Sequence, residues 1–276
     1  DIVVVGSTRD LNDLSKNIES TDATDVLLMS PGGLANIYPE PLAELELKRI
    51  GMFQRVIPSD TLLGLKRSRQ IAGMPFIALK AHSLSPSRST LKRILETAYL
   101  LIAAIPLTII SLFVASYIRA LAGRNIIYRQ ERVGKFGVHF NMLKFRTMGE
   151  NAESQTGVIK ANQQDSRVLP GLNWIRRTRL DELPQFINVA KGEMSIIGPR
   201  PERPDFTKEY ERAIPGYGRR HDIPPGITGL AQVNGGYHTD PSYKLGHDLQ
   251  YLVNWSPILD VQILFQTVWI VLSRRL

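Results

Sequence analysis

The chain has 276 residues, 43% of them hydrophobic, which is enough for one large or two modest domains with their own cores. It contains no cysteine, which excludes a disulfide framework, thiolate catalysis and a cysteine-based zinc site. The net charge is +8, but residues 1–85 hold nine Lys or Arg and ten Asp or Glu, so the positive charge lies in the second part and indicates an anionic partner.

The first 80 residues alternate short apolar runs with segments of helical spacing. The runs that predict strands are Ile2–Val5, Val26–Met29, Arg55–Pro58 and Phe76–Leu79, and the predicted helices are Leu11–Ile18 and Leu42–Ile50. This order predicts an α/β fold, with a partial Rossmann-like domain over residues 1–80. Pro31-Gly32-Gly33 is interpreted as an ordinary turn rather than an anion-binding nest. Because a strand pattern begins at once after Asp1, we expect the chain to be a fragment of a longer protein.

Residues 81–90 are polar and predict a linker, which leaves 91–276 as a second, mainly helical domain. Residues 97–118 carry no charge over a length that could cross a bilayer. Pro106 lies within this run and should kink or break the helix. Basic residues flank both ends, which places both ends on the cytoplasmic side of a membrane. These features predict a re-entrant membrane helix over about 91–118; a buried core helix and an ordinary transmembrane span are the alternatives.

Two short strands are predicted next, at Ile126–Tyr128 and Val138–Met142, around a Gly-Lys-Phe-Gly turn. Lys144 and Arg146 follow and alternate with apolar residues, so they should share a strand face. That face could meet phosphates, although a solvated strand face has the same pattern.

Asp181 and Glu182 are adjacent carboxylates that follow Arg176, Arg177 and Arg179. Proline is tolerated in the first turn of a helix, so the proline at 184 predicts a helix that begins at about Asp181 and ends at the glycine at 192. Free N–H groups at a helix start favour an anion at Asp181. Such a carboxylate is a candidate nucleophile or metal ligand; a simple helix cap is the alternative.

Ser195–Ile197 predict a short buried strand that leads into Gly-Pro-Arg-Pro at 198–201. The two prolines restrict the backbone around Arg200, so its guanidinium should be held in a stiff loop. A rigid guanidinium beside two carboxylates suits a phosphate that is gripped by two hydrogen bonds. Arg203 follows at the start of a predicted helix and is a further candidate for phosphate binding.

The segment 224–235 is rich in glycine, which would let the backbone approach a ligand closely, and it contains Gln232. His238, Asp240, His247 and Asp248 fit no known spacing of metal ligands and are interpreted as structural.

Two helices are predicted at the end of the chain. The first is Tyr243–Asn254, and the second starts at Ser256-Pro257 and runs to about Leu272. Partial membrane contact is predicted for an apolar stripe on the second helix, made of Ile258, Val261, Leu264, Phe265, Val268 and Leu272.

Three motifs together carry a resemblance to a known family. They are Arg-Thr-Arg-Leu-Asp-Glu-Leu-Pro-Gln-Phe through Gly-Pro-Arg-Pro, Lys-Phe-Arg-Thr-Met, and Pro-Gly-Ile-Thr-Gly-Leu-Ala-Gln-Val. The chain resembles the bacterial sugar transferases, the monotopic polyprenyl-phosphate phosphoglycosyl transferases, over roughly residues 90–272. Their re-entrant helix has a Ser-Pro pair at its break, whereas Ile105 precedes Pro106 here.

The resemblance implies transfer of a sugar 1-phosphate from a UDP-sugar to undecaprenyl or another polyprenyl phosphate, the first membrane step of exopolysaccharide, capsule or O-antigen synthesis. It implies that Asp181 forms a covalent phosphosugar and that Glu182 binds Mg²⁺ with it and orients the acceptor. Arg200 is implied to hold phosphate, with Lys144, Arg146, Arg203 and Gln232 as further contacts.

The expected partners are therefore the UDP-sugar, the polyprenyl phosphate and inner-membrane lipid, with catalysis at the cytoplasmic face. A second copy of the chain, docked through the α/β region, is a further candidate partner. A nucleic-acid partner is not expected, because a long uncharged run interrupts the basic residues. The alternative function is a non-catalytic membrane-surface scaffold whose basic patch binds acidic lipid.

Overall fold

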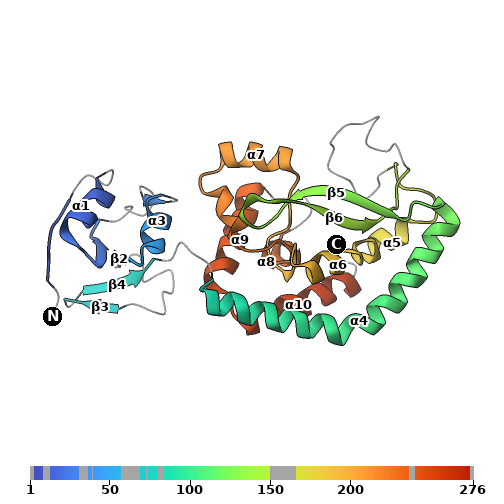
Figure 1. Ribbon diagram of the computed structural model, residues 1–276, viewed down its shortest axis with the longest axis horizontal. Helices are drawn as coiled ribbons and strands as arrows, with labels where there is room; N and C mark the ends of the chain where they lie inside the picture. The colour runs from blue at the N-terminus through green and yellow to red at the C-terminus, as the bar shows by residue number, and fades with distance from the viewer. Residues whose placement is uncertain are drawn as a thin grey trace. The chain divides into compact units, whose positions relative to one another are not determined.

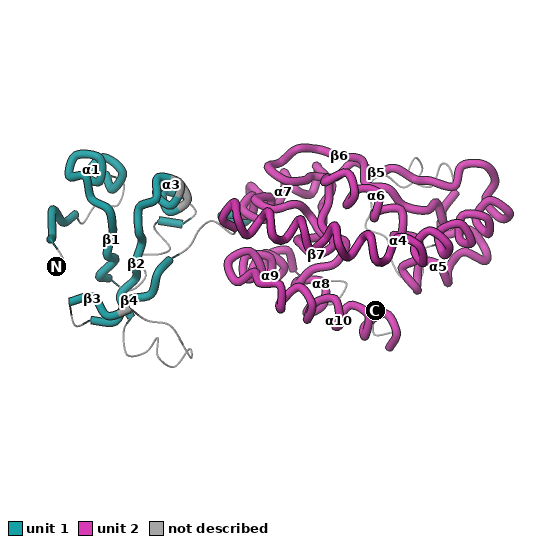
Figure 2. The backbone as a smooth tube through the Cα atoms, turned by 60° about the horizontal axis from the view of Figure 1, so that its bottom comes forward, with its two compact units in different colours: residues 1–83, 214–216 teal, residues 84–213, 217–276 magenta. Residues whose placement is uncertain are grey.

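The computed structural model describes residues 3–8, 13–30, 37–38, 40–56, 69–72, 74–79, 84–149, 166–235 and 240–273. The chain divides into two compact units (Figure 2). Unit 1 comprises residues 1–83 with 214–216, and unit 2 comprises residues 84–213 with 217–276.

In its described residues, unit 1 contains a small mixed sheet and the helices α1 (Leu14–Thr21) and α3 (Leu42–Leu47). The sheet order is β1-β2-β4-β3, made of Asp25–Leu28, Gly51–Arg55, Met74–Ala78 and Arg69–Ile71. Its core gathers apolar side chains from both helices and the first two strands: Leu14, Ile18, Leu28, Leu42, Leu45 and Met52.

The sheet of unit 1 does not confirm a Rossmann-like domain. Only β1 and β2 run parallel, whereas β2 with β4 and β4 with β3 are antiparallel. The predicted first strand, Ile2–Val5, is wrong over its described part, because residues 3–8 form no strand and Val3 and Val4 are exposed. An apolar run becomes a strand only when a neighbouring strand pairs with its backbone. The predicted Pro31-Gly32-Gly33 turn lies outside the described residues.

Unit 2 begins with α4, Pro86–Ala122, a single helix of 37 residues that starts inside the predicted linker. Figure 1 shows that α4 bends part-way along, and Pro106 lies inside it. A proline inside a helix removes one backbone bond and crowds the preceding turn, which accounts for a bend. The helix is therefore bent rather than broken.

The exposed surface of α4 excludes one alternative for this segment, the buried core helix. Its most apolar 18-residue window is only 6% buried, so α4 is not a buried core helix. By length and composition it could cross a membrane. Val114 and Ile118, near its end, pack against Phe145 and Ile175, while its middle exposes apolar side chains, among them Leu101, Ile102, Ile105, Ile109, Leu112 and Phe113.

An antiparallel hairpin follows, made of β5 (Ile127–Val133) and β6 (His139–Phe145). The predicted strand at 195–197 is confirmed as β7 (Ser195–Ile197), which pairs in parallel with β8 (Gly226–Thr228). The remaining helices are α5 (Asn173–Arg177), α6 (Gln185–Lys191), α7 (Pro204–Ala213), α8 (Leu230–Asn234), α9 (Pro241–Asn254) and α10 (Pro257–Ser273).

The sequence explains where the last two helices begin. The carboxylate of Asp240 accepts hydrogen bonds from the backbone N–H groups of Ser242 and Tyr243, so Asp240 caps α9. The hydroxyl of Ser256 accepts a bond from the N–H of Leu259 at 3.2 Å, as predicted for the start of α10. Most of the predicted stripe on α10 is exposed: Ile258, Val261, Phe265, Val268 and Leu272.

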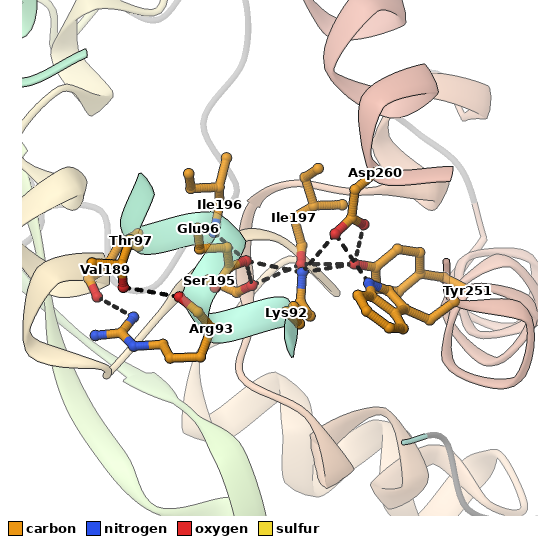
Figure 3. Close-up of polar contacts among 11 residues, drawn as sticks. Lys92, Arg93, Glu96, Thr97, Val189, Ser195, Ile196, Ile197, Tyr251 and Asp260 are labelled. Atoms are coloured by element: carbon orange, nitrogen blue, oxygen red, sulfur yellow. Dashed lines mark hydrogen bonds and ion pairs between the residues drawn. The ribbon is translucent and has the colours of Figure 1, made fainter. Parts of the chain in front are cut away.

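A buried polar cluster joins the first turns of α4 to the rest of unit 2 (Figure 3). The ammonium of Lys92 lies 2.9 Å from the Glu96 carboxylate and 3.2 Å from that of Asp260 in α10. Glu96 in turn accepts hydrogen bonds from the Ser195 hydroxyl and the Ile196 N–H of β7. These contacts fix β7 against the start of α4.

The same turn of α4 also holds α6. The guanidinium of Arg93 donates to the carbonyl of Val189 at 2.7 Å (Figure 3) and to that of Ala190 at 3.0 Å, near the end of α6. The Val189 carbonyl also accepts a bond from the Gly192 N–H, so the guanidinium adds a second hydrogen bond at the C-terminal end of α6. The start of α4 thus contacts both β7 and α6, the elements that position the candidate site.

Candidate functional site

The Asp181–Glu182 pair lies in a short 3-10 turn, Leu180–Glu182, and not at the start of α6 as predicted. Arg179 enters this turn with a left-handed backbone, φ 58°. Pro184 has no N–H to continue an α-helical ladder, and the carbonyl of Leu180 accepts a bond from the Leu183 N–H instead. The predicted start of this helix at about Asp181 is therefore wrong, but Gly192 ends α6 as predicted.

Glu182 is buried and surrounded by cations. Its Oε1 lies 2.9 Å from Nζ of Lys144, 2.9 Å from a guanidinium nitrogen of Arg200, and 3.6 Å from one of Arg179. Burial alone would raise the pKa of Glu182, but Lys144 and Arg200 hold that pKa well below its usual value. Glu182 therefore stays ionised and orients two cationic side chains.

The surroundings of Asp181 shift its pKa in the opposite direction from that of Glu182. Its Oδ1 is buried and accepts no hydrogen bond from the part of the chain that the structure describes. Burial and the neighbouring charge of Glu182 raise the pKa of Asp181 to about 6, although Lys144 and two arginines oppose the shift. An unpartnered carboxylate oxygen with a raised pKa suits a nucleophile or a metal ligand.

Arg200 approaches the pair from the loop that follows β7. Its side chain is 36% exposed, and a guanidinium has five N–H donors, of which one nitrogen contacts Glu182. Attraction by Glu182 is the main cause that raises the pKa of Arg200, with a smaller contribution from Asp181. The charged groups of Asp181, Glu182 and Arg200 therefore lie close enough to act on one phosphate.

Two glycines of segment 224–235 are required by packing within the protein, and the predicted approach to a ligand stays a prediction. A Cβ built on Gly226 would lie 2.1 Å from the backbone nitrogen of Gly198, and one on Gly229 would lie 2.1 Å from the carbonyl oxygen of Gly198. These glycines let two backbone segments of the protein approach each other. The contact fixes the beginning of the Arg200 loop.

The sequence of the chain is similar to those of known proteins. Residues 87–274 match the model of the family described as bacterial sugar transferase. The chain belongs to the bacterial sugar transferase family. The part of the chain that matches holds the Asp181–Glu182 pair, Lys144 and Arg200.

Individual members of the family are also similar. The chain is 41% identical over 243 residues to a UDP-N-acetylgalactosamine-undecaprenyl-phosphate N-acetylgalactosaminephosphotransferase of Aeromonas hydrophila, a match that covers 87% of this chain and 56% of that protein. It is 40% identical over 225 residues to the UDP-glucose:undecaprenyl-phosphate glucose-1-phosphate transferase of Escherichia coli K12, covering 78% of this chain and 47% of that protein. The chain thus spans about half the length of these curated relatives.

A shorter relative is a putative undecaprenyl-phosphate N-acetylgalactosaminyl 1-phosphate transferase of Bacillus subtilis. It is 44% identical over 151 residues, which are 52% of this chain and 83% of that protein. Sugar transferases of this family therefore include proteins much shorter than the other two relatives.

The other predicted site residues contact other parts of the chain. The guanidinium of Arg146 donates to the carbonyl of Ala122 at the end of α4, while its backbone N–H pairs with the Ile126 carbonyl. Arg203 lines a shallow pocket beside β5, and Gln232 donates to the Ile227 carbonyl. Their predicted contacts with phosphate stay predictions.

The sequence analysis missed Asn188, a fully buried residue of α6 that positions Lys144. Its amide accepts from the N–H of Leu143 at 3.0 Å and donates to the carbonyl of Asn141 at 2.9 Å, which ties β6 to α6. An asparagine between apolar residues of a short helix is the sequence signal that could have revealed it, because a buried amide needs partners.

The carboxylate pair fits a magnesium ion that is shared with a substrate. No group of three or more potential ligand side chains occurs in the described ranges of the chain. Mg²⁺ is commonly held by one or two carboxylates together with substrate phosphates, so a full protein cage is not required. Asp181 offers a buried, unpartnered oxygen, whereas Oε1 of Glu182 is already engaged by Lys144 and Arg200.

Proposed function

We propose that this protein transfers a sugar 1-phosphate from a UDP-sugar to undecaprenyl phosphate through a covalent phosphosugar on Asp181. The similar transferases named above act on UDP-sugars and undecaprenyl phosphate. The observation that carries the proposal is the arrangement of the two carboxylates. A buried Asp181 oxygen that has no hydrogen-bond partner among the described residues lies next to Glu182, which is held by two cations.

In the first step, the free carboxylate oxygen of Asp181 attacks the β-phosphorus of the donor. A bond forms between this oxygen and phosphorus, and the bond from phosphorus to the oxygen of UMP breaks. UMP leaves with the electron pair of that bond. The reacting oxygen must be deprotonated, and its pKa of about 6 leaves it mostly ionised at neutral pH while it retains a useful basicity.

In the second step, a phosphate oxygen of the polyprenyl acceptor attacks the same phosphorus, and the bond to Asp181 breaks. The products are a polyprenyl diphosphate sugar and a free Asp181 carboxylate. The acceptor is already anionic and needs no strong base, since a phosphate monoester carries about −1.5 to −2 charges at neutral pH. The low pKa of Glu182 fits a residue that orients Lys144 and Arg200, and not one that removes a proton.

Cationic side chains stabilise the charge that spreads over the phosphoryl oxygens during both steps. Arg200 and Lys144 reach the carboxylate pair directly and are the principal candidates. Arg146, Arg203 and Gln232 would act only where the donor extends beyond this centre. When bound by Asp181, Glu182 and the diphosphate, Mg²⁺ would neutralise part of the donor's negative charge.

The reaction would take place at the cytoplasmic face of the bacterial inner membrane, where the lipid acceptor is held. The long, exposed apolar surface of α4 supports association with a membrane, and a re-entrant insertion would keep the basic flanks of the helix on one side. The product would begin an exopolysaccharide, capsule or O-antigen unit. A homodimer is kept only as a prediction from the sequence.

The proposal is tested with the whole chain in lipid nanodiscs that contain undecaprenyl phosphate. UDP-N-acetylgalactosamine and UDP-glucose are supplied separately, and UMP and the lipid product are measured by chromatography. We expect UMP and lipid-linked sugar with at least one donor, and a loss of more than about 1,000-fold in Asp181→Asn, because a covalent route depends on its nucleophile. Asp22→Asn, on the exposed surface of unit 1, is the control.

Binding of acidic vesicles without UMP release from a panel of UDP-sugars would favour the scaffold function instead. Turnover at the wild-type rate in Asp181→Asn would overturn the covalent route.

A further inference from the structure

The loop that carries Arg200 is fixed through its backbone. Every carbonyl from residue 199 to residue 202 accepts a hydrogen bond from another element. The donors, in order, are the N–H of Gly226 at 2.8 Å, the guanidinium of Arg220 at 3.0 Å, the guanidinium of Arg132 at 3.1 Å and the N–H of Val133 at 3.0 Å. The loop is therefore held on both sides of Arg200.

The bond to the carbonyl of Arg200 itself comes from Arg220, a buried side chain with its own support. Arg220 is only 3% exposed and lies 2.8 Å from the carboxylate of Asp248 in α9, which is 2% exposed. It also donates to the hydroxyl of Tyr217 and lies 5.0 Å from the centre of that ring. A charge buried this completely is retained only when it is paired and hydrogen-bonded.

The direction of the Arg200 side chain follows from these contacts. Prolines at 199 and 201 restrict the backbone on either side, and the bond from Arg220 fixes the plane of the peptide that follows Arg200. With the backbone fixed, the guanidinium reaches Glu182 at 2.9 Å. A group that must meet a phosphate loses much of its effect when it is displaced by about 1 Å.

We propose that Arg220, held by Asp248, is a positioning residue that aims the Arg200 guanidinium at the donor phosphate. This inference rests on the proposed function, because it assigns Arg220 a part in the same reaction. Arg220 contacts the backbone of Arg200 and acts through it. It is one of a pair of neighbouring arginines, and the other, Arg219, pairs with Asp222 at 3.0 Å.

The test separates positioning from a general loss of structure. Arg220→Met alone would leave Asp248 buried without its partner, so the working variant is Arg220→Met/Asp248→Asn, which removes both charges together. This double substitution is introduced into the wild-type chain and, separately, into the Arg200→Ala variant. Arg219→Met is the matched control, since it removes the other arginine of the pair. Initial rates of UMP release are measured in undecaprenyl-phosphate nanodiscs, and thermal unfolding midpoints are recorded for each variant.

We expect the double variant to lower kcat/KM by about 10- to 100-fold in the wild-type chain. In the Arg200→Ala chain the same double substitution should lower kcat/KM by less than about twofold, because the Arg200 guanidinium that Arg220 would position is absent. Arg219→Met should stay within about twofold of wild type. Arg220→Lys, which keeps the charge but loses the planar fork, is a milder second variant and should lie between wild type and the double variant.

Equal losses in the wild-type and Arg200→Ala chains would overturn the inference, because they would show an effect that does not pass through Arg200. Full activity in both the double variant and Arg220→Lys would do the same. Failure of the proposed function is a different result: the wild-type chain itself would release no UMP with any donor.

Discussion

Asp181 and Glu182 are neighbours in the chain, yet their surroundings drive their pKa values in opposite directions. Glu182 is ionised because Lys144 and Arg200 compensate for its burial. Within the described ranges of the chain, the buried oxygen of Asp181 has no such partner, and burial raises the pKa of Asp181 to about 6. This difference assigns Asp181 to bond formation and Glu182 to orientation.

The raised pKa predicts how activity depends on pH. Because the attacking oxygen must be deprotonated, kcat/KM for the UDP-sugar should be constant above about pH 7 and fall below about pH 6, by about tenfold for each further pH unit. Initial rates of UMP release between pH 5 and 8 measure this, with samples returned to pH 7.5 to confirm that activity recovers. A flat profile from pH 5 to 7 would contradict a nucleophile with this pKa.

The same shift predicts that the charge of Asp181 destabilises the folded state at neutral pH. Because the pKa of about 6 in the folded state lies above the ordinary value of 3.8, the protonated form of Asp181 stabilises the folded state. This stabilisation is complete below about pH 3.8 and is lost as the pH rises through 6. Asp181→Asn should therefore be more stable than wild type at pH 7, by about 1–3 kcal/mol. Thermal unfolding at pH 7 and pH 5 tests this, since the advantage should shrink at the lower pH. A variant that is less stable than wild type at pH 7 would refute the prediction.

At the scale of elements, the first turns of α4 hold the elements that carry the site. Glu96 holds β7, which leads to Arg200, and Arg93 holds the end of α6, which follows Asp181 and Glu182. Both contacts join elements that are distant in the sequence.

Lys92 supports this arrangement, because it neutralises Glu96 and Asp260 together. Lys92→Met would leave two buried carboxylates uncompensated and should cost about 3–5 kcal/mol of stability. Arg88→Met, on the exposed surface of the same helix, should stay within about 0.5 kcal/mol of wild type. Chemical unfolding of both variants in detergent tests the difference, and equal stability would show that the cluster contributes little.

The sequence predicted elements best where local signals decide their boundaries. Ser256-Pro257 at the start of α10, Gly192 at the end of α6 and the apolar run of β7 were all confirmed. The strand predicted at Ile2–Val5 was wrong over its described part, because no local pattern reveals whether a partner strand exists.

The candidate site was predicted only in part, because sequence motifs indicate some of its residues but not the contacts between distant segments. The motif order along the chain indicated Asp181, Glu182, Lys144 and Arg200, and the structure brings these four together. The partners of Arg220 and Asn188 depend on contacts between segments that are far apart in the sequence, and no spacing rule predicts those contacts. Arg146 donates to the carbonyl of Ala122, a contact with another segment that the strand alternation does not predict.

At the scale of the whole molecule, unit 2 exposes apolar side chains on α4 and on α10. If α10 lies in the membrane surface, Phe265→Glu in α10 should lower the fraction of protein that binds liposomes by several-fold, because a charge on the apolar face opposes insertion. Gln262→Glu adds the same charge at an exposed polar position of α10 and is the control. Equal binding by both variants in flotation assays would exclude α10 from the membrane surface.

The central claim is that Asp181 forms a covalent bond to phosphorus, and trapping this species tests it most directly. The whole chain is incubated with the preferred UDP-sugar without the lipid acceptor, quenched within seconds and analysed by intact-protein and peptide mass spectrometry. We predict one equivalent of UMP per protein and a mass increase of one sugar phosphate on the peptide that contains Asp181, both absent in Asp181→Asn. Release of UMP only when both substrates are present, with no adduct at any quench time, would contradict the claim and indicate direct transfer.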